Sequence, residues 1–209
     1  MLKHLLSLLL VVPAVLGHSS HGRTDLTSVK EAFKADEIVP QIIPRFEPIA
    51  QATLTFNYAN GSSVVISGPG TRIQRNDAQI APAITIGYGR HPPKYYVGVI
   101  VDPDAPSRQN PIRRSIRHYL ARDLTIDRKT GFLKNFTAVA NEYRGPNPPA
   151  GSGGHRYIFF LYKQPKNLDI SFLDLNNRTN FNLAEFVEKT GLGDPIAGNY
   201  FVSEYQAPA

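Results

Sequence analysis

The chain has 209 residues, of which 42% are hydrophobic and 19% are charged, a composition that is typical of a folded domain and excludes a disordered chain. It contains no cysteine, which excludes thiol catalysis, iron–sulfur clusters and zinc held by cysteine. The formal net charge of +6 favours anionic partners, but no basic tail or aromatic–basic repeat is present, so nucleic acid is not an expected partner.

Residues 1–17 have the pattern of a secretory signal peptide. A basic start at Lys3 precedes an apolar run, and small residues lead to Gly17, after which we expect cleavage. The run is too short for a comfortable membrane span, and no later stretch is apolar enough for one. Cleavage would leave His18 with a free amine near His21, an arrangement that can bind copper, but nothing else indicates redox chemistry and no cofactor is predicted. We therefore expect a secreted, extracellular protein, with the vacuole or another secretory compartment as alternatives.

The sequence also contains sites at which a secreted chain can be modified. Three Asn-x-Ser/Thr sequons lie at Asn60, Asn135 and Asn177, and none has proline in the middle. Each is therefore a candidate for N-glycosylation.

Two stretches have the apolar spacing of amphipathic helices. The first runs from about residue 25 to Asp36, and the second covers residues 181–192 with Asn182 as its N-cap and Gly191 as its stop. Three prolines within residues 38–48 predict an extended segment. Since no repeat or linker divides the chain further, we expect a signal peptide at 1–17, an N-terminal helix and proline-rich segment at 18–50, and one domain at 51–209.

That domain is predicted to be rich in β-strands, because runs of β-branched and aromatic residues recur along it. Asn60-Gly61 is a hairpin signal between two of these runs. The predicted strands cover residues 51–58, 64–66, 83–88, 95–101, 113–126, 155–165 and 196–205.

Polar side chains gather where predicted strands begin or end. Asp102 and Asp104 follow a hydrophobic strand, His118 lies on the apolar face of a later one, and His155 and Tyr157 follow a glycine- and proline-rich loop. Two acids and two imidazoles suit a zinc or iron site. They equally suit an anion pocket in which imidazolium and phenol groups donate hydrogen bonds while the acids orient the histidines. The spacing alone leaves both interpretations open.

Several separated motifs resemble, in their order, the phosphatidylethanolamine-binding protein (PEBP) family. The resemblance extends from about Ala52 to Tyr205. The N-terminal helix and the segment IVPQIIPRF are more similar to the fungal branch that includes the carboxypeptidase Y inhibitor. The motifs are DPDAPSR at 102–108, GPNPPAGSGGHRY at 145–157, FFLYKQ at 159–164, FNLAEFVEKTGL at 181–192 and PIAGNYF at 195–201.

The resemblance implies a mainly β fold, with a large central antiparallel sheet, a smaller flanking sheet and a few peripheral helices. It also implies one small pocket for phosphate or phospholipid head groups. A glycine of the pocket wall is replaced here by Asn147, so a different backbone shape is expected there. The chain ends before the C-terminal helix of animal members, so a more open pocket mouth is expected. The residues that match the pocket's motif positions are Asp102, Asp104, His118, Pro149, His155 and Tyr157.

These residues favour binding over catalysis. The adjacent acids are expected to raise the pKa of both histidines and so promote anion capture near or below neutral pH. No GxSxG motif is present and no motif places a serine beside a histidine, so we predict a non-catalytic binding protein, not an enzyme. Contact with a membrane surface is compatible with this prediction.

Two alternatives remain. The branch resemblance predicts a secreted inhibitor of serine carboxypeptidases or other serine proteases, acting through surface loops or the N-terminal segment. A metal-dependent hydrolase would instead use Asp102, Asp104, His118 and His155 as ligands.

Overall fold

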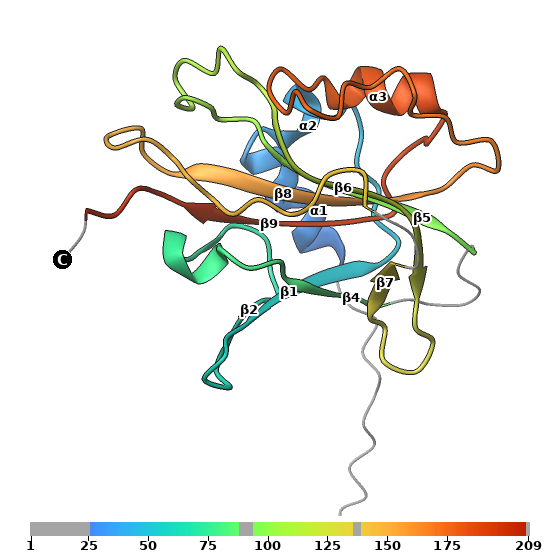
Figure 1. Cartoon of the computed structure of the whole chain (residues 1–209), viewed down its shortest axis with the longest axis horizontal. Coiled ribbons are helices and arrows are strands. Elements are labelled where there is room, and N and C mark those ends of the chain that lie inside the picture. Colours follow the sequence, from blue (N-terminus) through green and yellow to red (C-terminus); the bar gives the residue numbers. More distant parts are fainter. Residues whose placement is uncertain (1–25, 88–93, 136–138, 208–209) are drawn as a thin grey trace, which may run out of the picture.

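A six-stranded sheet runs through the centre of the protein (Figure 1). The structure, a computed structural model, describes residues 26–87, 94–135 and 139–207, so the expected signal peptide and the His18–His21 pair lie outside the described residues. The strand order is β3-β9-β8-β5-β6-β7, and all neighbours are antiparallel except β3 and β9, which are parallel. The strands are β3 (Thr71–Arg72), β5 (Tyr96–Asp102), β6 (Ile116–Ile126), β7 (Leu133–Asn135), β8 (His155–Lys163) and β9 (Ala197–Ser203).

A three-stranded antiparallel sheet with the order β2-β1-β4 flanks the large one. The predicted hairpin at Asn60-Gly61 connects its first two strands, with Gly61 at a φ of 84°, a value that glycine adopts without strain. The strands are β1 (Gln51–Asn57), β2 (Ser63–Ile66) and β4 (Ala83–Gly87), and a 3-10 turn, η1 (Arg75–Ala78), precedes β4.

The large sheet is covered on both faces because side chains alternate along its strands. On β8, Phe160 and Tyr162 pack into the same core as Phe33 of the first helix. Their neighbours Tyr157 and Phe159 pack into a second core shared with the small sheet. In Figure 1 the helix α3 lies above the large sheet and the small sheet lies below it. The predicted fold, mainly β with a large and a small sheet, is confirmed.

The two predicted helices form close to their expected bounds, as α1 (Leu26–Ala35) and α3 (Leu183–Thr190). The Asn182 side chain accepts a hydrogen bond from the backbone N–H of Glu185 at 3.2 Å, and Gly191 ends the helix at a φ of 67°. Both predicted end signals are therefore confirmed. No helix in the described part of the chain has the length and apolar character needed to cross a membrane.

The expectation of a wholly extended segment over 38–48 is wrong at its start, where a four-residue helix, α2 (Ile38–Gln41), forms. Its turn is closed by a hydrogen bond of 3.0 Å from the Ile42 N–H to the Ile38 carbonyl, which needs no donor from Pro40. The Ile38 side chain is fully buried in the core beside α1. Val39, the residue before Pro40, keeps extended dihedrals (φ −107°, ψ 123°), so proline still interrupts regular helix here.

Candidate functional site

The end of β5 lies beside the beginning of β8, because these strands are antiparallel neighbours paired through Val101 and Ile158. This pairing brings Asp102 to His155, whose Nδ1 lies 2.9 Å from the carboxylate Oδ2. The other carboxylate oxygen accepts a hydrogen bond of 2.8 Å from the backbone N–H of Asp104. Since Asp102 and His155 are 3% and 1% exposed, their interaction is shielded from water.

Asp104 does not orient a histidine, contrary to the expectation. It pairs with Arg156, whose backbone N–H also donates to Oδ2 at 2.9 Å. A further hydrogen bond ties the Arg156 guanidinium to the backbone carbonyl of Asp36, just after α1. The strand ends at Asp102, so the alternation that would place the two acids on one side stops before Asp104. Arg156 is a buried member of the site that sequence reasoning missed.

His118 lies at an irregularity of β6, where Tyr119 and Arg117 pair with consecutive residues of β5 and leave it as the extra residue. Its Nδ1 lies 2.6 Å from the backbone carbonyl of Arg144, and because a carbonyl can only accept a hydrogen bond, Nδ1 carries the hydrogen that it donates. The imidazole meets the ring of Tyr157 edge-on, with 5.0 Å between ring centroids. The strand pairing thus brings His118 to Tyr157, and in this tautomer Nε2 is the nitrogen that can accept a hydrogen bond.

The hydroxyl of Tyr157 is buried, and the backbone N–H of Asn147 lies close enough to lower its pKa as a donor, but no described residue accepts the proton of this hydroxyl. The Ser203 hydroxyl, which lies on β9 directly opposite His155, is also buried and has no hydrogen-bond partner among the described residues. Burial, followed by the charge of Asp102, raises the pKa of Tyr157, so its hydroxyl stays protonated. A buried O–H group without an acceptor lowers the stability of the folded protein, and a ligand oxygen that accepts its hydrogen bond would remove this penalty.

The glycine- and proline-rich loop places a serine against His155 that motif reasoning did not find. The Ser152 Oγ lies 3.1 Å from His155 Nε2 and donates to the Pro149 carbonyl at 2.8 Å. Pro149 itself is exposed and contributes its carbonyl to this contact. Asn147, the residue in place of the family's glycine, does not have a positive φ, so the loop there does not require glycine. A serine three residues before the histidine was the only sequence signal for this contact.

The pKa values of the two histidines shift in opposite directions. Burial lowers the pKa of His155, but the hydrogen bond and charge of Asp102 outweigh it, and the net pKa is raised. Burial lowers the pKa of His118 and outweighs its hydrogen bond to the Arg144 carbonyl. The expectation that acids raise both values therefore holds for His155 and is wrong for His118. His155 is therefore the histidine that gains a proton more readily, and His118 the one that more readily stays neutral.

The geometry also bears on the metal-site alternative. The Asp104 carboxylate is paired with Arg156, and the Nδ1 of His155 is hydrogen-bonded to Asp102. Within the described ranges, no group of three or more His, Asp or Glu side chains is placed to hold a metal ion. The cluster is built from hydrogen bonds and ion pairs.

Comparison with known proteins assigns the family. The family model described as "Phosphatidylethanolamine-binding protein" matches residues 49–201. The chain belongs to the PEBP family. This confirms the resemblance inferred from the motifs, and the matched region contains Asp102, His118 and His155.

Individual relatives agree with the assignment. A Drosophila melanogaster protein named "Putative odorant-binding protein A5" is 29% identical over 184 residues, which are 85% of this chain and 81% of that protein. The structure of a carboxypeptidase Y inhibitor complexed with its cognate proteinase matches 86% of this chain and 96% of the inhibitor, with a TM-score of 0.73 and 22% identity. The PEBP of Plasmodium vivax matches 85% of this chain and 98% of its own, with a TM-score of 0.67 and 20% identity. These two structures establish the PEBP fold.

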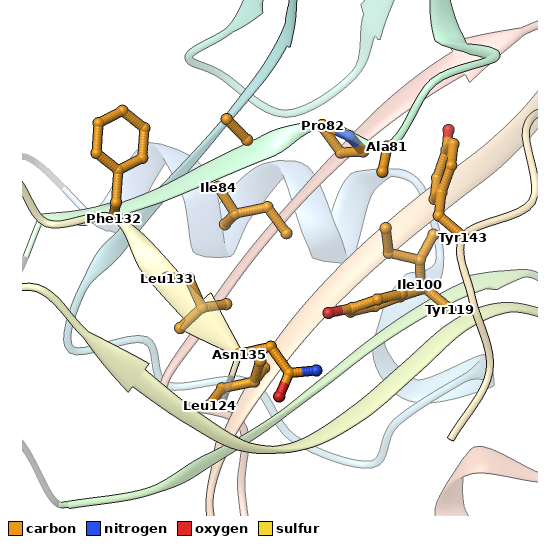
Figure 2. A pocket seen from close by; sticks show the side chains of 11 residues that line it. Ala81, Pro82, Ile84, Ile100, Tyr119, Leu124, Phe132, Leu133, Asn135 and Tyr143 are labelled. Atoms are coloured by element: carbon orange, nitrogen blue, oxygen red, sulfur yellow. The ribbon is translucent and has the colours of Figure 1, made fainter. Parts of the chain in front are cut away.

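A small hollow of this PEBP lies away from the cluster, between β4 and the strands β6 and β7 (Figure 2). Its volume is about 160 Å³, and Ile84, Tyr119 and Leu133 are among the side chains that line it. The sequon residue Asn135 also lines it. Because none of its lining residues belongs to the Asp102–His155 cluster, this hollow reflects packing between the layers and not the candidate site.

Proposed function

We propose that this PEBP is a non-catalytic binding protein whose cluster around His155 and Tyr157 captures a phosphate or a phospholipid head group. The observation that carries the proposal is the buried Tyr157 hydroxyl, which is protonated and has no acceptor among the described residues. A phosphoryl oxygen would accept from this hydroxyl and interact with the nearby imidazolium of His155. Charge-assisted hydrogen bonds of this kind are the stronger ones.

The placement of the Ser152 proton favours binding over catalysis. An Asp–His–Ser array activates serine only when the histidine Nε2 accepts the serine proton. Here the Ser152 hydroxyl donates to Pro149, and the raised pKa of His155 favours the form with protons on both nitrogens. In that form Nε2 donates to Ser152 and has no lone pair with which to accept a proton. The array is therefore suited to holding an anion.

Isothermal titration calorimetry with phosphorylethanolamine and with inorganic phosphate tests the proposal. Replacing Tyr157 by Phe removes only the hydroxyl and should weaken binding about tenfold or more. Tyr162→Phe is the matched control, because its hydroxyl is also buried without a partner but belongs to the other face of β8. Equal affinities of the wild type, Tyr157→Phe and His155→Ala would refute the proposal. Parallel titrations with vesicles that contain phosphatidylethanolamine distinguish a lipid head group from a free phosphate.

The likeness to the carboxypeptidase Y inhibitor supports a second candidate, inhibition of serine carboxypeptidases. Such inhibition would use surface segments, so His155→Ala should inhibit as well as the wild type. The assay measures peptide hydrolysis by carboxypeptidase Y with the full secreted chain as titrant. No loss of protease activity at micromolar concentration would count against this function and leave the anion site unaffected.

A further inference from the structure

A second hollow lies on the opposite side of the large sheet from the Tyr157 cluster, beside α3. Its volume is about 620 Å³, within the range of about 300–1,000 Å³ that is usual for small-molecule sites. Apolar wall residues include Ile43 before β1, Val187 on α3 and Pro195 before β9. We call this hollow the α3 groove.

Tyr162 also lines the α3 groove, and its hydroxyl is a buried polar group. The side chain is fully buried, and its hydroxyl has no hydrogen-bond partner among the described residues. Burial, followed by the charge of Asp194, raises the pKa of Tyr162, so its hydroxyl stays protonated. A ligand or a water molecule that reaches the Tyr162 hydroxyl would supply the missing hydrogen-bond acceptor.

The charged residues of the groove are mostly carboxylates. Asp194 is paired with Arg45, and Glu185 is paired with Lys189 at 2.6 Å. Glu188 lines the groove as well, and it has no ion-pair partner in the described part of the chain. An unpaired carboxylate beside an apolar wall attracts cations and repels anions. The groove therefore has the opposite charge preference to the cluster around His155.

We propose that the α3 groove binds a small amphipathic organic cation, with its apolar body against Val187, a polar atom on the Tyr162 hydroxyl and its ammonium group beside Glu188. The site is separate from the proposed anion pocket and does not depend on it. Three features support it: the size of the groove, the hydroxyl without a partner and the unpaired acid. Together they select for shape, for one hydrogen bond and for positive charge.

Three probes of nearly equal shape test the charge preference on the full secreted chain. They are 1-naphthylmethylamine, the neutral 1-naphthalenemethanol and the anionic 1-naphthoic acid. Binding is followed by calorimetry and by shifts in protein NMR spectra. We expect saturable one-to-one binding of the amine, about fivefold weaker binding of the alcohol and no saturable binding of the acid.

Four variants locate the site. Ala184→Trp fills the groove from an exposed position of α3 and should abolish amine binding without unfolding the protein. Tyr162→Phe and Glu188→Gln should each weaken amine binding about three- to tenfold. Tyr157→Phe is the control that should leave amine binding unchanged.

The proposal is overturned if the amine does not saturate the wild type or binds no better than the acid. It is also overturned if amine affinity is unchanged in Ala184→Trp, Tyr162→Phe or Glu188→Gln. If the wild type binds the amine but does not bind phosphate, only the proposed anion pocket is refuted. The two proposals can therefore fail separately.

Discussion

Arg156 holds both carboxylate oxygens of Asp104 in a buried salt bridge, with Nη2–Oδ1 and Nε–Oδ2 distances of 2.6 and 2.8 Å. Removing one partner of such a pair leaves an uncompensated buried charge. We therefore expect Asp104→Asn to lower the free energy of unfolding by about 3–5 kcal/mol. Urea unfolding followed by circular dichroism measures the loss.

The exposed ion pair between Lys30 and Glu47, at 2.6 Å, provides the control for that measurement. Glu47→Gln should change the unfolding midpoint little, because water and salt already screen an exposed pair. Equal losses in Asp104→Asn and Glu47→Gln would contradict the structural role of Asp104.

The two histidines are expected to titrate on opposite sides of the ordinary histidine pKa of 6.5. Because the folded pKa of His155 is raised, its stabilising contribution is complete below pH 6.5 and is lost as the pH rises through the folded value. His118 has a lowered pKa, so its contribution is present above pH 6.5 and is lost as the pH falls through its folded value. Imidazole NMR titrations should give a higher midpoint for His155 than for His118, and the reverse order would contradict these assignments.

Phosphate affinity should follow the protonation of His155. Binding is expected to weaken as the pH rises through the raised pKa of His155, because the cationic donor is then lost. Asp102→Asn removes the hydrogen bond and charge that raise this pKa, so its affinity should begin to fall at lower pH than that of the wild type. Calorimetric titration with phosphate at several pH values checks both expectations. A pH-independent affinity would show that His155 does not supply charge to the ligand.

Ser152 is expected to remain unmodified by a fluorophosphonate probe. Labelling requires His155 Nε2 to accept the Ser152 proton, and that proton is donated to Pro149. Mass spectrometry after incubation, with a serine carboxypeptidase as the positive control, measures adduct formation. A stoichiometric adduct that disappears in Ser152→Ala would establish an activated nucleophile and overturn the non-catalytic proposal.

The three sequons are expected to differ in glycan occupancy if the chain is secreted. Asn60 and Asn177 are exposed, and their Oδ1 atoms accept from the hydroxyls of Ser62 and Thr179 at 2.7 and 2.9 Å. Asn135 lines the hollow between the layers, where a glycan would displace packed side chains (Figure 2). Glycopeptide mass spectrometry of protein from a eukaryotic secretory host should find glycans at the first two sites only. A glycan at Asn135, whatever the occupancy of the other two sites, would contradict this placement.

The sequence predicts the strands and the family because both depend on contiguous patterns. The hydrophobic run at residues 155–163 predicts a strand, and the capping residue Asn182 predicts the start of a helix. The partners within the cluster depend on register instead. The pairing of Val101 with Ile158 brings Asp102 to His155, and a one-residue change in register would separate them.

The misassigned details arise from local departures from regular geometry. Asp104 lies beyond the end of β5, so its side chain does not follow the alternation of side chains along that strand. His118 is the extra residue at an irregularity of β6. The low pKa of His118 results from burial by distant parts of the chain, which a single sequence does not reveal. Ser152 was missed because its contact with His155 depends on the fold of the glycine-rich loop.

Asp36 precedes the region that matches the family, which begins at residue 49. Nevertheless, its backbone carbonyl accepts a hydrogen bond from Arg156, and its carboxylate accepts one from the Tyr200 hydroxyl at 2.6 Å. A chain shortened to the matched region would lose both acceptors and expose the guanidinium behind Asp104. The stable unit of this protein is therefore longer than the segment that similarity outlines, and it includes α1, because Asp36 directly after this helix supports the Asp104–Arg156 pair.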